Sequence, residues 1–193
     1  MRVGLTGNIG SGKTTVCRIF ETLNIPVFYA DNEAKKLYSR RDVKNKLKTF
    51  YGNSIFNERG EIDVKILAAI IFQDKKALQF INDLIHPLVF EVYNNWLKRN
   101  EAAAYTVFES AIIFENNLQH NFNKTVMVVC PEQVRIKRVM ERDNLEKEKI
   151  LARIKNQWPE DKKKNLADFL INNDGNEWLI PQVLEIHKAL TNN

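Results

Sequence analysis

The feature that most restricts the fold is an octapeptide close to the start of the chain. Residues 7–14 read GNIGSGKT, which fits the pattern G-x-x-x-x-G-K-[ST] of a phosphate-binding P-loop. An apolar stretch, Arg2–Thr6, precedes the motif, and an amphipathic segment, Lys13–Leu23, follows it. A P-loop joins a strand to a helix, so this context predicts a strand–loop–helix unit of an α/β sheet rather than a simple glycine-rich turn.

Each position of the motif has a physical role in holding a phosphate group. Glycines let the main chain turn successive N–H groups toward an anion, and the positive end of the following helix dipole points at the same place. Lys13 supplies a mobile positive charge for the β- and γ-phosphates, and the Thr14 hydroxyl can bind Mg²⁺. We therefore predict ATP and Mg²⁺ as cofactors, with the nucleotide held by Gly10, Ser11, Gly12, Lys13, Thr14 and Thr15.

The rest of the chain alternates short apolar runs with longer amphipathic segments. This alternation is typical of an α/β protein with a parallel sheet that is buried on both faces. Helices are expected at about 13–23, 131–142 and 146–157, and Pro159 is expected to end the last of them. Besides Arg2–Thr6, the expected strands are Val27–Ala30, Ala104–Glu109, Thr125–Cys130 and Asp168–Asn172.

A long segment, Asn32–Asn100, separates the second expected strand from the third. It is too long for one crossover helix, and apolar residues recur in it at helical spacing, so we predict an inserted helical subdomain. Proline disfavours helical backbone in the residue before it. We therefore expect the helical pattern to break at His86-Pro87.

Composition restricts the protein class. The chain has 193 residues, of which 44% are hydrophobic and 27% charged, so a folded core is expected. The longest apolar run, Ile66–Phe72, is far shorter than the roughly 18–20 residues that cross a membrane. Removal of a leader would also remove the P-loop, so we expect a cytoplasmic protein. Cys17 and Cys130 fit no zinc or disulfide pattern and are expected to be buried.

The net charge of +5 comes mostly from one stretch. Between Glu132 and Lys164 there are 11 Lys or Arg against 7 Asp or Glu. Three arginines there share one helix face by their spacing, and Arg153 follows on the next expected helix. Guanidinium groups stabilise the charge that gathers during phosphoryl transfer, which favours a lid that closes over the phosphates. The alternative is a solvated charged face; the three arginines are Arg135, Arg138 and Arg142.

Carboxylates at the ends of expected strands are candidates for the chemistry. A kinase needs a group that accepts the proton of the acceptor hydroxyl at the carboxyl edge of the sheet. Asp31 follows the second expected strand, which as a parallel neighbour would bring it close to the P-loop, so we predict it as the general base. The alternative is a helix N-cap. Glu109 ends the third expected strand and either holds Mg²⁺ through water or only shapes the site. The same two alternatives apply to Glu115, which lies further along the chain.

Taken together, these motifs resemble those of dephospho-CoA kinases over nearly the whole chain. The sequence GLTGNIGSGKT at residues 4–14 resembles the opening G-L-T-G-x-I-G-S-G-K-[ST] of that family. Other nucleotide kinases share this opening, but the ordered set that follows it is more specific. That set comprises Tyr29–Asp31, resembling D-A-D; Leu84–Pro87, resembling I-x-H-P; Ile112–Glu115, resembling L-L-F-E; Arg138–Asp143, matching R-x-x-x-R-D; Gln157; and Ala167–Asp168 with Ile171–Gly175, resembling A-D…I-x-N-x-G.

The resemblance implies a reaction and an architecture. The reaction is transfer of a phosphoryl group from ATP to the ribose 3′-hydroxyl of dephospho-CoA, giving CoA and ADP. The fold is the three-layer α/β/α fold of P-loop kinases, with a five-stranded parallel sheet. Its parts are a nucleotide-binding core at 1–31, 101–131 and 165–193, a helical substrate domain at 32–100 and a helical lid at 132–164.

The resemblance also implies roles for single residues. The catalytic groups are Asp31, Lys13 and Arg138, and Thr14 holds the metal. Asp31, His86 and Glu115 lie on the substrate side, although a core or helix-capping role stays open for His86. Nucleotide binding by the P-loop is extended by Arg142, Asn172 and Gly175.

The sequence departs from the family pattern at several positions. Asn8 replaces a usual glycine, which is tolerable if its φ need not be positive. Ser110-Ala111 stands where valine or isoleucine and proline usually precede L-L-F-E. Arg135 replaces a usual glutamine, and Lys65 stands near a usual arginine. None of these changes removes a predicted catalytic group.

Two other functions remain open at this point. A nucleoside or nucleotide monophosphate kinase would phosphorylate its acceptor without preferring the pantetheine arm. A nucleic-acid-binding module would use the basic stretch, but acidic residues interleave with it and we find no nucleic-acid motif. We expect a monomer that acts on a small molecule, with no nucleic-acid or membrane partner.

Overall fold

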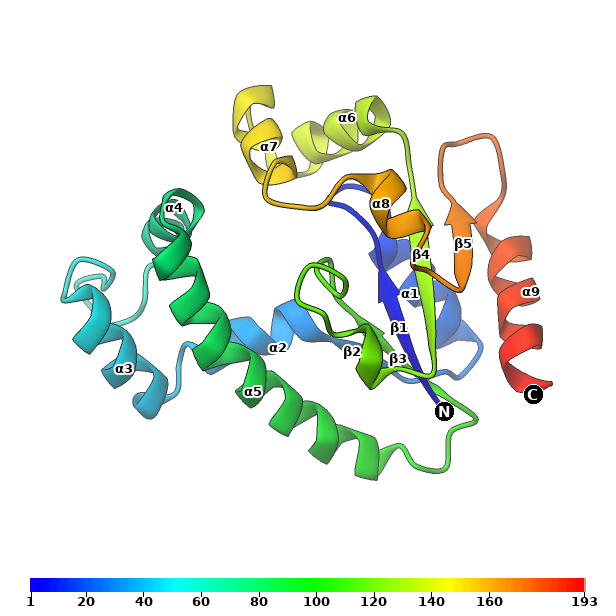
Figure 1. Cartoon of the computed structure of the whole chain (residues 1–193), viewed down its shortest axis with the longest axis horizontal. Helices are drawn as coiled ribbons and strands as arrows, with labels where there is room; N and C mark the ends of the chain where they lie inside the picture. Colours follow the sequence, from blue (N-terminus) through cyan, green and yellow to red (C-terminus); the bar gives the residue numbers. More distant parts are fainter. Residues whose placement is uncertain (193) are drawn as a thin grey trace. The chain divides into compact units, whose positions relative to one another are not determined.

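A computed structural model describes residues 1–192, apart from the side chains of Lys65, Phe72, Gln73 and Lys75. The chain divides into two compact units, Met1–Tyr29 with Arg99–Asn193 and, between them in sequence, Ala30–Lys98 (Figure 1). We call them the sheet unit and the helical unit. The departure noted at Lys65 falls outside the described residues.

The sheet unit is built on five parallel strands in the order β2-β3-β1-β4-β5. Their short apolar sequences suit strands that are buried on both faces, and β1, β3 and β4 are almost entirely buried. The five-stranded parallel sheet of the sequence prediction is confirmed. The strands are β1 (Arg2–Thr6), β2 (Val27–Tyr29), β3 (Thr106–Glu109), β4 (Lys124–Val129) and β5 (Phe169–Asn172).

The strand order corrects one expectation. β3, and not β2, is the neighbour of β1 on that side, with Leu5 paired to Glu109. The expectation that β2 is the neighbouring strand was wrong because the chain returns from the helical unit to insert β3 between β2 and β1. The strand-end carboxylate beside the P-loop is therefore Glu109. Strand β2 also ends at Tyr29, and Asp31 lies in the first turn of the helix that follows.

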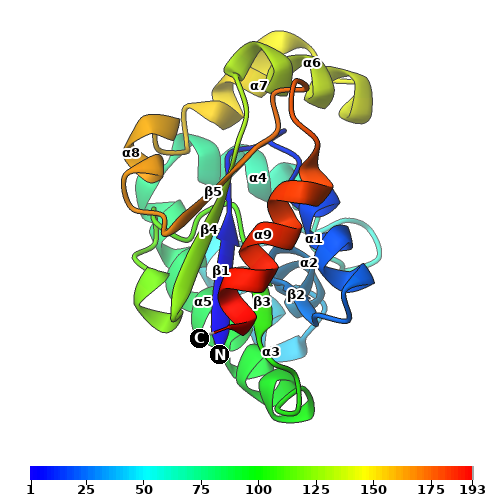
Figure 2. The same ribbon diagram turned by 90° about the vertical axis from the view of Figure 1, so that its right-hand side faces the viewer.

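Helices cover both faces of the sheet. Helices α1 (Lys13–Thr22) and α9 (Leu179–Thr191) pack on one face, and the short α8 (Glu160–Lys164) lies on the other (Figure 2). The three-layer α/β/α prediction is confirmed. The core under α1 and α9 includes Val3, Leu5, Val16, Phe20, Val128, Ile171, Val183 and Leu190.

A helical pair follows β4. Helices α6 (Glu132–Asp143) and α7 (Lys147–Ile154) share a small core of Ile136, Val139 and Ile150. The side chain of Ile9, from the P-loop, packs against this core. The expected helix at 146–157 ends at Ile154, and Pro159 precedes α8 rather than ending α7. A 3₁₀ turn, Gln119–Asn121, lies between β3 and β4.

The helical unit contains α2 (Ala30–Leu37), α3 (Arg41–Tyr51), α4 (Val64–Gln73) and α5 (Lys75–Arg99). Helix α5 runs through Pro87 without interruption, so the predicted break at His86-Pro87 was wrong. Proline removes one main-chain hydrogen bond from a helix. Buried residues on both sides of it, Ile85 and Val89, keep the helix packed and outweigh this local cost.

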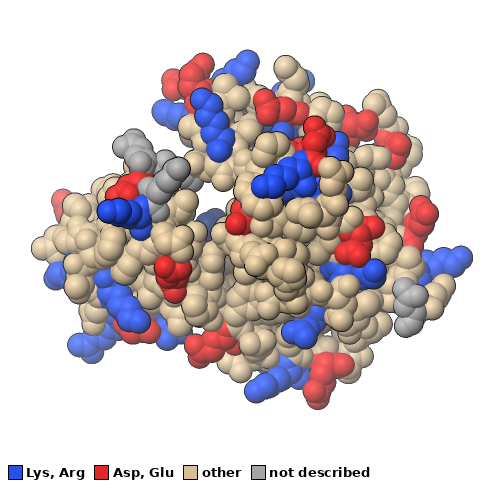
Figure 3. All heavy atoms as spheres, viewed as in Figure 1, with Lys and Arg blue, Asp and Glu red and all other residues tan. Residues whose placement is uncertain are grey.

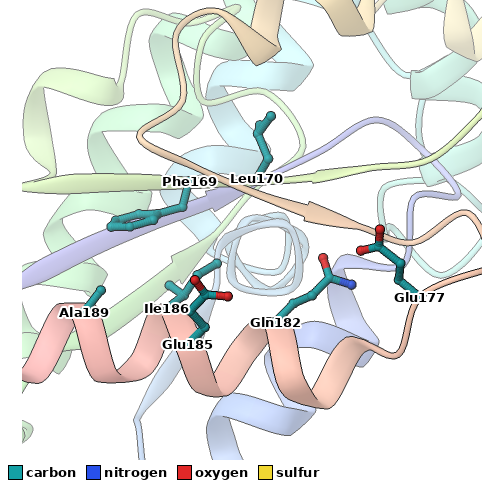
Figure 4. A pocket seen from close by; sticks show the side chains of 7 residues that line it. All are labelled: Phe169, Leu170, Glu177, Gln182, Glu185, Ile186 and Ala189. Carbon is teal, nitrogen blue, oxygen red and sulfur yellow. The ribbon is translucent and has the colours of Figure 1, made fainter.

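Two further features of the fold bear on function. A cavity of about 310 Å³ lies between β5 and α9, and its lining includes Phe169 and the carboxylates of Glu177 and Glu185 (Figure 4). In the described part of the chain, each helix is too short or too polar to cross a membrane.

Cys17 and Cys130 are buried and form no disulfide bond with each other, as expected. Burial raises the pKa of the Cys17 thiol.

Candidate phosphate-binding site

The P-loop contains glycines whose backbone conformation other residues rarely adopt. Gly10 and Gly12 have φ of +79° and +94°, where other residues are strained. A Cβ on Gly10 would lie 2.7 Å from the carbonyl oxygen of Arg135, and a Cβ on Gly12 would overlap the side-chain amide of Asn173. The loop is therefore closely surrounded by α6 and by the segment after β5. Asn8 does not have a positive φ, so its replacement of glycine adds no strain there.

Ser11 lies at the centre of this loop with its side chain fully buried. Its hydroxyl oxygen has no hydrogen-bond partner among the described residues. A buried hydroxyl without a partner is costly, because it has left water without gaining a hydrogen bond in return. A phosphate oxygen held by the surrounding main-chain N–H groups would supply that partner, so this cradle fits the phosphates of a nucleotide.

Lys13 begins α1 and turns back over the loop. Its ammonium group donates to the carbonyl oxygen of Gly7 at 3.0 Å and lies 3.8 Å from a carboxylate oxygen of Glu109. Both charged side chains are largely buried, with 11% and 8% exposed. The buried carboxylate compensates the lysine charge within the protein, and the flexible stem lets the ammonium group reach an incoming phosphate. Thr14 and Thr15 follow in the first turn of α1 and are exposed.

Asn173 connects the P-loop to α6, and the sequence prediction missed it. Its side-chain amide donates to the carbonyl oxygen of Ser11 at 2.8 Å. The main-chain carbonyl oxygen of Asn173 accepts a hydrogen bond from Arg138 Nη1 at 3.0 Å. Arg138 thereby lies against the loop, with Nη1 3.9 Å from the Cβ position of Gly12. Asn173 belongs to the I-x-N-x-G match, which was the signal that could have singled it out.

Residues after α7 contact the outer turn of the loop. Gln157 Oε1 accepts a hydrogen bond from the Ile9 N–H at 2.8 Å, and Asn8 donates to the Trp158 carbonyl at 3.3 Å. Trp158 in turn donates its N–H to Glu115 Oε1 at 3.0 Å. The P-loop is thus bounded by α6, by Asn173 and by the Gln157–Trp158 segment.

Comparison with known proteins agrees with this geometry. Residues 1–178 match the protein family described as dephospho-CoA kinase. A dephospho-CoA kinase from Bacteroides fragilis is 34% identical over 187 residues, covering 96% of this chain and 91% of that protein. The chain belongs to the dephospho-CoA kinase family.

Solved structures agree with the fold. A crystal structure of a Thermus thermophilus protein superposes with a TM-score of 0.88 at 30% identity, covering 98% of this chain and 96% of that one. The structure of a dephospho-CoA kinase from Campylobacter jejuni superposes with a TM-score of 0.69 at 24% identity, covering 99% and 97%. The sheet unit therefore has the fold of P-loop kinases.

The four arginines expected in the dephospho-CoA kinase lid have different surroundings. Arg135 is 3% exposed, and its Nε donates to the Cys130 carbonyl at 2.9 Å, so its guanidinium group is held inside the sheet unit. The main chain of Arg135 lies close to Gly10 of the P-loop. Arg142 and Arg153 instead pair with Asp143, at 2.7 Å and 3.5 Å.

Four other residues were predicted for the dephospho-CoA kinase site. Asn172 and Gly175 belong to the sheet unit, and Asp31 and His86 belong to the helical unit. Asn172 is exposed, and its main-chain N–H and carbonyl form hydrogen bonds with the Gln182 side chain. Gly175, in the loop that follows, has a φ of +102°. Asp31 is an exposed residue of α2. His86 is half-buried in α5, and burial lowers the pKa of its imidazole, an effect that Asp83 partly offsets.

Proposed function

We propose that this kinase transfers the γ-phosphoryl group of ATP to the ribose 3′-hydroxyl of dephospho-CoA, giving CoA and ADP. Membership of the dephospho-CoA kinase family supports the acceptor, and the buried, partnerless hydroxyl of Ser11 in its glycine cradle supports the donor site. In this proposal the main chain of residues 10–15 and Lys13 bind the β- and γ-phosphates. Arg138, held beside Gly12, stabilises the negative charge that builds up on the transferred group.

The donor is proposed to bind with Mg²⁺. The Thr14 hydroxyl at the start of α1 suits a hard cation that prefers oxygen ligands, and Glu109 beside Lys13 could act on the same cation through water. When bound, Mg²⁺ neutralises part of the charge on the phosphate oxygens. The residues of this chain hold the phosphates in place and keep water away from them.

Asp31 is proposed as the general base, and it acts at the acceptor hydroxyl. Residues 32–100 are proposed as the acceptor domain, with His86 on the substrate side. Residues 132–164, which belong to the sheet unit, are proposed as the lid, with Arg142 joining the phosphates on closure. Asn172 and Gly175 are proposed beside the adenine. We propose a cytoplasmic monomer.

The two alternatives have weaker support. A nucleoside monophosphate kinase would share the P-loop, but the match over residues 1–178 is to dephospho-CoA kinases. A nucleic-acid-binding module needs a continuous basic surface. On the face in Figure 3, Lys and Arg lie interspersed with Asp and Glu, and Lys163 and Arg135 of the basic stretch are buried.

An acceptor comparison tests the proposal directly. Purified protein with Mg-ATP is given dephospho-CoA, adenosine, AMP or CMP, and ADP release is measured. We expect dephospho-CoA to have the highest kcat/KM by a wide margin, with the new phosphate on the 3′ position by NMR. Equal or faster turnover of AMP or CMP would contradict the proposal and indicate a nucleotide monophosphate kinase.

The general base is tested by Asp31→Asn. Loss of a positioned base lowers rates by about 10²–10⁴-fold, and the exposed position predicts an unchanged fold. Glu33→Gln, in the same first turn of α2, is the matched control and should keep its activity. Near-wild-type turnover by Asp31→Asn would remove Asp31 from the mechanism.

A further inference from the structure

Lys163 is a charged residue that is completely buried. It lies on the five-residue helix α8, and its side chain is 0% exposed, while the neighbouring Lys162 is exposed. A lysine is almost never fully buried unless it is paired, because taking its charge out of water is costly. Its ammonium group donates to Glu115 Oε1 at 2.7 Å and to the Ala111 carbonyl at 3.2 Å. Such a costly arrangement calls for an explanation beyond general stability.

Glu115 connects this pair to the main chain at Trp158. Its Oε1 accepts from both Lys163 and the Trp158 N–H, and the other oxygen, Oε2, is buried. Its side chain is 9% exposed. Glu115 therefore makes its contacts inside the protein, where Lys163 fixes the position of its carboxylate and the carboxylate fixes the Trp158 main chain.

The Trp158 main chain lies against the outer turn of the P-loop. The Trp158 carbonyl accepts a hydrogen bond from the Asn8 side chain, and the Gln157 side chain accepts one from the Ile9 N–H. The Ile9 N–H is thus directed to a protein acceptor, and the conformation of the turn before Gly10 depends on where Gln157 lies. Displacement of this segment would change the direction of the phosphate-binding N–H groups that follow.

Both ends of this connection are anchored to the sheet. On one side, Ala111 follows Ser110, whose N–H donates to the Leu5 carbonyl at 3.0 Å. On the other, Glu160 of α8 accepts from the Cys130 N–H at the end of β4, at 3.1 Å. The pair is therefore held by rigid elements and can act as a fixed support for the loop.

We propose that Glu115 is a positioning residue of this kinase: its buried carboxylate, whose charge Lys163 compensates, accepts from the Trp158 N–H and so fixes the Gln157–Trp158 segment against the main chain of the P-loop. The proposal rests on the proposed function for its kinetic test. It assigns Glu115 to the nucleotide side, as a support of the P-loop, and answers whether this carboxylate acts on Mg²⁺ or shapes the site. Burial lowers the pKa of Lys163, and the Glu115 carboxylate opposes that shift and favours the charged form.

Two double variants separate positioning from stability. Lys163→Met with Glu115→Gln and Lys163→Met with Glu115→Leu both remove the two buried charges together, which avoids leaving one charge unpaired. They differ in one group, because glutamine keeps an oxygen that can accept from the Trp158 N–H and leucine does not. Lys164→Met, which removes a charge that pairs with Glu160 and Asp161 on the same helix, is the control.

Activity is measured well below the Tm of each variant, with the folded fraction checked by circular dichroism. We expect the Gln-containing double variant to stay within about 5-fold of the wild type in kcat/KM for ATP. The Leu-containing double variant should fall by up to about 100-fold, since a misplacement of about 1 Å costs that much. KM for dephospho-CoA should stay unchanged in both. Equal kcat/KM for the two folded double variants, whether high or low, would overturn the proposal.

A second readout does not need the acceptor. The amide NMR signal of Ile9 and the affinity for a fluorescent ATP analogue are compared in the same variants. The proposal predicts a shifted Ile9 signal and weaker binding in the Leu-containing variant only. An unchanged Ile9 signal there would contradict it. If the wild-type protein instead failed to phosphorylate dephospho-CoA, the proposed function would fail while these two readouts would still decide the role of Glu115.

Discussion

The P-loop and the α6–α7 arginines Arg142 and Arg153 have opposite environments. The P-loop is held by Asn173, Gln157 and the Trp158 main chain, and its Ser11 hydroxyl is buried. Arg142 is 63% exposed and Arg153 is 40% exposed, and both contact Asp143 on their own helical pair. One region is fixed by contacts from distant parts of the chain, and the other has its charges paired locally in solvent.

The difference indicates how the work is divided between the two regions. Groups that must hold fixed positions for the phosphates are prepared by the fold, so their removal should damage binding and catalysis. Exposed arginines that pair with one carboxylate can exchange it for a phosphate at small cost, since surface ion pairs contribute only about 0–1 kcal/mol. Arg138 and Arg135 belong with the fixed region, although they lie on the same helix as Arg142.

The largest effect is expected for Lys13→Ala. Removing the buried cation should lower turnover by about 10³-fold or more, because the proposed phosphate site would lose the positive charge that stabilises the transferred group. Lys188→Ala, an exposed lysine of α9, should be indistinguishable from the wild type. Turnover is measured by ADP release. A Lys13→Ala protein with full activity would break the claim that the fixed region binds the phosphates.

The next effect separates two arginines of α6. Arg135→Met should lower the free energy of unfolding by about 2–3 kcal/mol, because it removes a buried, charge-assisted hydrogen bond to the Cys130 carbonyl. Arg142→Met should change it by no more than about 0.5 kcal/mol. Urea unfolding measures both. Equal destabilisation by the two variants would contradict the division between the fixed and the exposed region.

A smaller effect is expected for Asn173→Ala. It removes the hydrogen bond to the Ser11 carbonyl, and we expect a loss of about 1 kcal/mol in stability. KM for ATP should rise by about 10-fold, since the P-loop loses one of its side supports. Asn192→Ala, an exposed asparagine just after α9, is the control and should leave KM for ATP at the wild-type value. An unchanged KM for ATP in Asn173→Ala would show that this hydrogen bond does not support the P-loop.

The smallest effect concerns Asp143. Hydrogen bonds from Arg142 hold the pKa of this carboxyl below its ordinary value. A lowered folded-state pKa means that the contribution to stability is present above the unfolded pKa of about 3.9 and is lost as pH falls through the folded value. Asp143→Asn should therefore cost at most about 1 kcal/mol at pH 7, and this cost should shrink as the pH falls through the folded-state pKa. A cost that persists in acid would show that the pair is not electrostatic.

Local patterns predicted the sheet and the P-loop well. β1 was predicted to the residue, because the motif, the preceding apolar run and the following helix all constrain one another. Packing overrode the local signal at Pro87, where helix α5 continues because Ile85 and Val89 are buried. Burial of Arg135 could not be read from helical spacing, which gives a shared face but not what covers it.

Contacts between distant residues were beyond the sequence pattern. The hydrogen bond between Asn173 and Ser11 joins residues that are 162 positions apart in the sequence, and the Lys163–Glu115 ion pair joins residues that are 48 positions apart. No local periodicity specifies such pairs. The strand order, which places β3 beside β1, has the same origin, since it follows from how the whole chain packs rather than from any single strand.

The most direct measurement is a crystal structure with Mg²⁺ and a non-hydrolysable ATP analogue. We predict that the β- and γ-phosphates are held by the N–H groups of residues 10–15, the Ser11 hydroxyl and Lys13. The cavity between β5 and α9 should stay free of phosphate, because Glu177 and Glu185 repel it. Phosphates bound in that cavity, or a P-loop that stays unliganded at saturating nucleotide, would contradict the account.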